Sequence, residues 1–112
     1  MNEPLREAER HLAMGLLDRA EHLFGQVLER DPRNAIATLG LARVAGERGD
    51  ERAAFDLARR AVELDPGNAA AVALTVRLRE VLAGRGQAVE LPPSLRDRRA
   101  GVLDRLFRRR RD

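Results

Sequence analysis

The stretch Leu28-Glu29-Arg30-Asp31-Pro32-Arg33-Asn34 recurs 34 residues later as Val62-Glu63-Leu64-Asp65-Pro66-Gly67-Asn68. Aligning the first 34 residues with the next 34 gives nine identities. These are Leu5/Leu39, Ala8/Ala42, Gly15/Gly49, Ala20/Ala54, Leu23/Leu57, Glu29/Glu63, Asp31/Asp65, Pro32/Pro66 and Asn34/Asn68. A fixed period of about 20 to 50 residues is typical of a unit that stacks on copies of itself, because one copy cannot bury its apolar face alone. The sequence therefore predicts a repeat architecture.

Each period is predicted to form two helices joined by a short turn. In the second period, apolar residues keep helical spacing over 36–45 and 53–62, on either side of Glu47-Arg48-Gly49-Asp50. Pro66 ends the second helix, because a residue that precedes proline avoids the helical conformation, and Asn68 is predicted to cap the helix that follows. Asn34 is expected to do the same after Pro32. Small residues are expected where the paired helices face each other, with Phe24 and Phe55 filling the gaps nearby: Ala8, Ala20, Ala42, Ala54 and Ala61.

This pattern resembles the tetratricopeptide repeat, a 34-residue helix-turn-helix unit. The likeness rests on small residues at repeat positions 8 and 20 and proline at position 32, all present in both periods. The family also favours large residues at positions 4, 7 and 11, where this chain departs from it with Pro4, Thr38, Glu7, His11 and Ala45. The resemblance covers residues 1–68 and implies an all-α, right-handed solenoid of antiparallel helix pairs.

A third copy of the repeat is incomplete. Residues 69–82 are predicted to form a first helix and Gly84-Arg85-Gly86 the turn, but Leu91-Pro92-Pro93 breaks the second helix after about one turn. Ser94 is predicted to cap a new helix. The expected organisation is two full repeats, a partial third repeat that supplies one complete helix, a proline linker and a basic amphipathic C-terminal helix, at residues 1–34, 35–68, 69–90, 91–93 and 94–112.

The C-terminal helix is expected to cap the solenoid. Its apolar stripe is Leu95, Val102, Leu103, Leu106 and Phe107. The incomplete third repeat leaves Leu74, Val81 and Leu82 in need of a neighbour, and burying one Leu or Phe is worth about 1.5 to 3 kcal/mol. Binding of this stripe to a membrane or a partner remains the alternative.

Charge is concentrated in the same segment. Residues 94–112 carry eight arginines and three aspartates, whereas residues 1–93 carry thirteen arginines and fifteen acidic residues. The basic tail comprises Arg105, Arg108, Arg109, Arg110 and Arg111. Such a run can bind an anionic membrane surface, an acidic protein or phosphate groups, or it can simply be a solvated helix end. Nucleic acid is not favoured, because no aromatic residues are interleaved for base stacking.

The sequence offers little for catalysis. There is no cysteine, and the two histidines, His11 and His22, fall on different predicted helices without the spacing of a metal site on one helix. Gly84-Arg85-Gly86 is a turn between helices and does not follow a strand as a phosphate loop would. We therefore expect a protein that is not an enzyme and that has no cofactor or metal.

The family resemblance implies that the first helices of the repeats line a concave groove, chiefly through positions 2, 5, 9, 12 and 13. The candidate groove residues in this chain are Leu5, Glu9, Leu12, Ile36, Leu39, Arg43, Glu47, Ala73, Arg77 and Glu80. Arg43 and Arg77 lie one period apart and could each grip a carboxylate in bidentate fashion. The alternative is internal pairing, of Arg43 with Glu47 and of Arg77 with Glu80, and the sequence leaves both open.

The predicted function is therefore a protein-protein interaction adaptor that binds a peptide or helix, for which an acidic character would suit the arginines. The alternatives are a peripheral tether working through the basic tail, and a subunit that self-associates through its unfinished third repeat. Arginine as the only basic residue besides histidine indicates a bacterial codon pool, and the absence of an apolar leader or span predicts a cytoplasmic protein. The sequence does not determine the oligomeric state.

Overall fold

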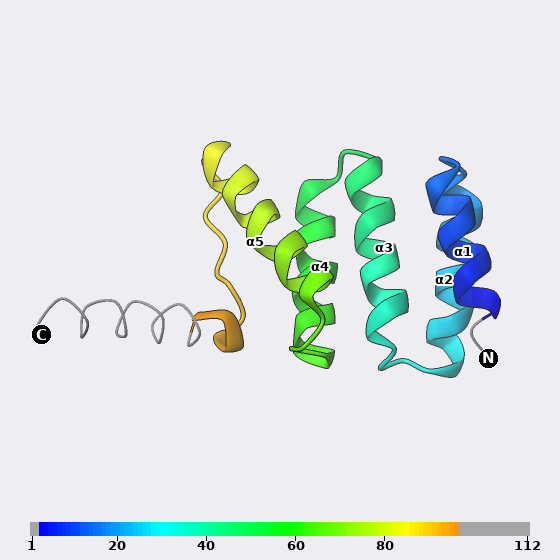
Figure 1. The fold of residues 1–112 in the computed structure, drawn as a ribbon. Coiled ribbons are helices and arrows are strands. Elements are labelled where there is room, and N and C mark those ends of the chain that lie inside the picture. The colour runs from blue at the N-terminus through cyan, green and yellow to red at the C-terminus, as the bar shows by residue number, and fades with distance from the viewer. Residues whose placement is uncertain (1–2, 97–112) are drawn as a thin grey trace, which may run out of the picture.

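The computed structural model describes residues 3–96, and these form a row of antiparallel α-helices (Figure 1). The helices are α1 (Glu3–Ala13), α2 (Leu17–Arg30), α3 (Ala35–Glu47), α4 (Glu51–Leu64) and α5 (Ala69–Gly84). Each helix packs on the next one along the chain, and α1 also contacts α3. No strand occurs in the described part of the chain. The predicted all-α solenoid of helix pairs is confirmed.

The helix ends follow the predicted signals. The side-chain oxygen of Asn34 accepts a hydrogen bond from the backbone N–H of Ala37 at 2.9 Å, and that of Asn68 accepts one from Ala71 at 3.1 Å. Both residues therefore cap the first helix of a repeat, as predicted. The turn after α3 contains Gly49 with φ of +82°, a conformation that glycine adopts without the steric cost of a Cβ atom.

The interior is built from small residues and two aromatic rings. The five alanines expected at the facing positions, Ala8, Ala20, Ala42, Ala54 and Ala61, are all fully buried. Phe24 and Phe55 are buried as well, each among the alanines of its own part of the solenoid. Phe24 in α2 reaches across the repeat junction to Gly40 in α3, and a Cβ atom at Gly40 would overlap the Phe24 ring. The missing side chain of Gly40 is therefore what lets α2 and α3 approach.

The segment after α5 differs from the prediction. Residues 87–92 form no helix at all, although one turn of helix was expected there, and a helical turn begins at Pro93 rather than after Ser94. The carbonyl oxygen of Pro92 accepts hydrogen bonds from the N–H groups of Leu95 and Arg96. Pro93 thus occupies the first position of the turn, which suits proline because an N–H at that position would have no partner within the helix.

Two of the three residues that we predicted as a proline linker lie in the core, whereas Pro93 is exposed. Leu91 and Pro92 are buried, and Leu91 and Leu95 belong to one apolar cluster with Ala61, Val62 and Ala71 at the junction of α4 and α5. The segment thus runs back along α5 and covers part of the face that a complete third repeat would cover with its second helix (Figure 1). Leu95 is the only residue of the predicted apolar stripe among the described residues, since Val102, Leu103, Leu106 and Phe107 lie outside them.

We expected Leu82 to be left uncovered by the incomplete third repeat, but it is buried. It is buried in a cluster with Ala42, Phe55 and Leu78, and Val89 packs against the same cluster. Leu74 and Val81 are half-buried. The open side of the third repeat is therefore smaller than the sequence suggested.

We predict that Gly40→Ala destabilises the fold by about 1 to 3 kcal/mol, because the added methyl group must displace the Phe24 ring from a packed interior. The matched control is Gly25→Ala in α2, where nothing lies within 4 Å of the added Cβ. That change should stabilise the helix by up to about 1 kcal/mol. Urea unfolding followed by circular dichroism measures both, and equal effects of the two substitutions would contradict the proposed close approach.

Candidate partner-binding face

The candidate groove residues lie on the first helices of the repeats. In Figure 1, α1 is drawn in front of α2 and α5 in front of α4, and α1 also contacts α3. We call the exposed part of this surface the A-helix face. It comprises Glu9, Ile36, Arg43, Glu47, Ala73, Arg77 and Glu80, all of which are exposed.

Three of the expected groove residues contribute little surface. Leu12 and Leu39 are each only 8% exposed, because they pack into the apolar clusters of the first and second repeats, and Leu5 is half-buried. Ile36, by contrast, is 48% exposed and is the largest apolar side chain on the A-helix face. The apolar floor that we predicted from Leu5, Leu39 and Ala73 is therefore supplied mainly by Ile36 and Ala73.

The two arginines of the A-helix face are not paired within the described structure. Neither Arg43 nor Arg77 forms an ion pair with any residue of 3–96, so the expected alternative pairs with Glu47 and Glu80 are not formed there. A guanidinium in this state keeps its full set of donors for a carboxylate from another molecule.

The outer face of α4 behaves differently. Arg52 pairs with Asp56 at 3.5 Å, and Arg59 and Arg60 both pair with Glu63, at 3.4 and 4.0 Å. These are neighbours one helical turn apart on the same helix, and each such exposed pair is worth only about 0.3 to 0.5 kcal/mol. The charges of that face therefore largely satisfy one another.

Sequence reasoning missed the ion pairs that join consecutive repeats. Arg48, in the turn after α3, donates hydrogen bonds to Glu21 and Asp18 in the first turns of α2, both at 2.5 Å. The bond to Glu21, and to a smaller degree that to Asp18, raises the pKa of Arg48 above its ordinary value. In the same way Arg85, in the turn after α5, pairs with Glu51 at the start of α4 at 2.9 Å. Both sets of ion pairs could have been found in the sequence by matching the charged residues of each turn with those at the start of the second helix of the preceding repeat.

The two histidines are brought together more closely than the sequence indicated. His11 and His22 line one hollow between α1 and α2, together with Glu7 and Asp18. The Nε2 atom of His11 lies 3.8 Å from Glu7, and His22 contacts Gln26 at 3.2 Å. Within residues 3–96 no three or more His, Cys, Asp or Glu side chains are arranged to hold a metal ion.

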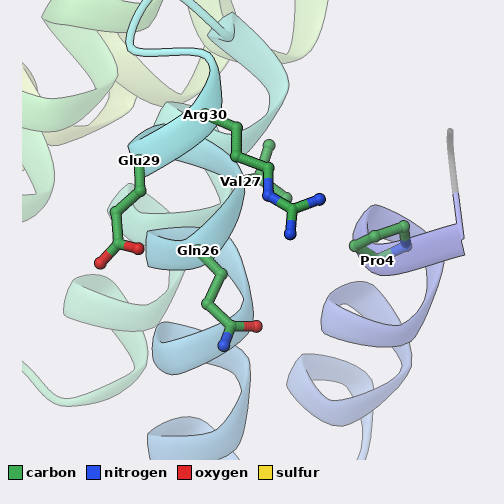
Figure 2. Close-up of a pocket in the computed structure, with 5 residues that line it drawn as sticks. All are labelled: Pro4, Gln26, Val27, Glu29 and Arg30. Atoms are coloured by element: carbon green, nitrogen blue, oxygen red, sulfur yellow. The ribbon is translucent and has the colours of Figure 1, made fainter.

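A second hollow lies where the first helix pair opens, between the N-terminal end of α1 and the C-terminal end of α2, and away from the A-helix face. Its lining residues are Pro4, Gln26, Val27, Glu29 and Arg30, none of which was singled out as a site residue (Figure 2).

No helix among residues 3–96 has the length and apolar character to cross a bilayer. The basic tail residues, Arg105 and Arg108 to Arg111, lie outside the described residues.

Comparison with known protein families agrees with this geometry. The family described as Tetratricopeptide repeat matches residues 5–69, more than half of the chain. Comparison with curated proteins and with solved structures gives no match. The chain belongs to the tetratricopeptide repeat family, whose repeats are generally non-catalytic modules for protein-protein interaction.

We predict that Arg43→Ala and Arg77→Ala each leave the free energy of unfolding within about 0.5 kcal/mol of the parent value, since neither side chain makes an ion pair within the described structure. Arg48→Ala should lower the melting temperature, and the loss should shrink as salt is added, because screening weakens exposed ion pairs. Thermal unfolding at low and high salt measures all three variants. A clear loss of stability in Arg43→Ala or Arg77→Ala would mean that these arginines serve the fold.

Proposed function

We propose that this tetratricopeptide-repeat protein is an adaptor that binds an acidic peptide or helix of a partner protein on its A-helix face. The observation that carries the proposal is the pair of exposed arginines, Arg43 and Arg77, which stand one repeat apart and are left without an ion-pair partner within residues 3–96. The membership of a family of interaction modules supports it.

The arrangement of the face suits an extended acidic ligand. Ile36 supplies an exposed apolar contact and Arg43 lies two helical turns further along α3, so one ligand could place an apolar side chain on the former and a carboxylate on the latter. Arg77 offers a second carboxylate site on α5. Glu9, Glu47 and Glu80 would repel a ligand with acidic groups out of register, so the same face favours particular spacings of charge.

The test is affinity purification with the full chain, followed by measurement of the dissociation constant of the captured partner by calorimetry. The double variant Arg43→Ala/Arg77→Ala should weaken binding at least about tenfold, a change of about 1.4 kcal/mol. The matched control is Arg52→Ala/Arg60→Ala, which removes the same charge from the outer face of α4. Equal losses in the two double variants would point to general charge attraction and would count against the A-helix face.

A second function is favoured by the way that α5 is covered. Leu91, Pro92 and Leu95 already occupy part of the open side of the third repeat, which reduces the need for the apolar residues Val102, Leu103, Leu106 and Phe107 to cap it. Residues 97–112 also contain seven arginines and three aspartates, a net charge of +4. Apolar and basic residues together suit an anionic membrane surface, where each basic residue contributes about 1 kcal/mol. We propose that this segment can tether the protein to such a surface.

Vesicle co-sedimentation tests the tether. The full chain should bind vesicles that contain phosphatidylserine and should not bind neutral phosphatidylcholine vesicles, and binding should weaken as salt increases. Replacing Arg108, Arg109, Arg110 and Arg111 by serine should abolish most of the binding, whereas Arg43→Ala/Arg77→Ala should leave it intact. Equally strong tail-dependent binding to duplex DNA would contradict a membrane role, because it would show attraction to any polyanion.

A further inference from the structure

The hollow at the open end of the first helix pair has properties that the proposed functions do not use. It lies between the first turn of α1 and the last turns of α2 and has a volume of about 220 Å³ (Figure 2). Pro4 and Val27 supply its apolar surface, and Gln26, Glu29 and Arg30 its polar surface. This volume is below the range of about 300 to 1,000 Å³ that is usual for drug-sized ligands, so the hollow suits a small molecule.

At repeat position 4 the first helix pair is less well covered than the second. Position 4 of a repeat favours a large residue that packs against the second helix, and here it is Pro4, which is exposed. Val27, across from it on α2, is consequently only half-buried. In the second repeat the corresponding residues, Thr38 and Ala61, are both buried. The residues that line the hollow all belong to the first helix pair.

The side chains around the hollow are arranged asymmetrically. Figure 2 shows the Arg30 guanidinium extending toward Pro4, whereas the Glu29 carboxylate points to the other side of α2. Arg30 forms no ion pair with any residue of 3–96. The amide of Gln26 lies one helical turn below Arg30 and offers further donors on the same side of the helix. The space thus combines an apolar wall with a guanidinium that has no ion-pair partner within residues 3–96.

We propose that this hollow binds a small organic carboxylate, with the apolar body of the ligand against Pro4 and Val27 and its carboxylate paired with Arg30. The planar guanidinium matches a carboxylate in bidentate geometry, and the Gln26 amide can donate to the same group. An inorganic anion would leave the apolar wall unused, and a neutral apolar ligand would leave the guanidinium without a partner. The proposal is independent of the A-helix face, because none of its residues lies on that face.

The experiment is a titration of the isotope-labelled full chain with N-acetyl-leucine, followed by two-dimensional NMR. Chemical-shift changes should concentrate at Gln26, Val27 and Arg30, with a dissociation constant on the order of 1 mM, as expected for a ligand of this size. N-acetyl-leucinamide, which has the same apolar body without the charge, should bind at least about fivefold more weakly. The same titration with a short peptide that ends in leucine and has a free carboxylate compares the dissociation constant of a chain end with that of a free small acid.

Two variants and one matched control complete the test. Arg30→Gln should weaken binding at least about fivefold, since it removes the charge and keeps a polar side chain that can still donate hydrogen bonds. Pro4→Leu should weaken binding by filling the apolar side, and it should raise the melting temperature because it restores a large residue at that position. Arg33→Gln, which removes a neighbouring arginine that does not line the hollow, should leave binding unchanged. Equal binding of the amide, unchanged binding by Arg30→Gln, or shifts that concentrate elsewhere would each overturn the proposal.

Discussion

The close approach of α2 to α3, set by the Phe24 ring against Gly40, is the contact on which the rest of the structure depends. It joins the first repeat to the second, and the buried alanines on either side permit the same closeness within each helix pair. Protein interiors are packed so densely that one added methyl group at such a point displaces a whole ring. Because α1 contacts α3 only when this junction is closed, the part of the A-helix face that lies on these two helices depends on it.

The sequence was sufficient to predict the helices and most of their ends, because the signals there are local. Asn34 and Asn68 cap the helices that they precede, and the prolines at positions 32 and 66 follow the ends of α2 and α4. The segment at 87–92 could not be predicted in the same way. Proline rules state that Leu91-Pro92-Pro93 cannot continue a helix, but they do not state which surface the extended chain then covers. Leu91 is buried because the face of α5 beside Ala71 is open, which is a property of the assembled solenoid.

The sequence indicates where the candidate residues lie on the helices, but it does not indicate their contacts. The 34-residue period puts Arg43 and Arg77 at equivalent positions on α3 and α5, and both are exposed as a groove residue should be. Whether each arginine pairs with the glutamate one turn away depends on side-chain preferences worth only about 0.2 to 0.5 kcal/mol, which no pattern resolves. The ion pairs of Arg48 with Asp18 and Glu21 were not predicted from the sequence for a different reason. They cross the junction between repeats and connect residues about 30 positions apart.

The same junction explains why the first helices differ so much in composition. α3 packs against both α2 and α4, so Ala37, Gly40 and Val44 are buried on the side toward α2. The residues at the equivalent positions of α1 are Glu3, Arg6 and Arg10, all exposed, because nothing within the described residues packs against that side. A charged surface of this kind cannot accept a second helix in the way that α3 accepts α2, since its charges would lose water without gaining partners. Stacking of one copy's α1 onto the α5 end of another copy is therefore disfavoured. The A-helix face differs from this surface, because it combines the exposed Ile36 with two arginines that form no ion pair within residues 3–96.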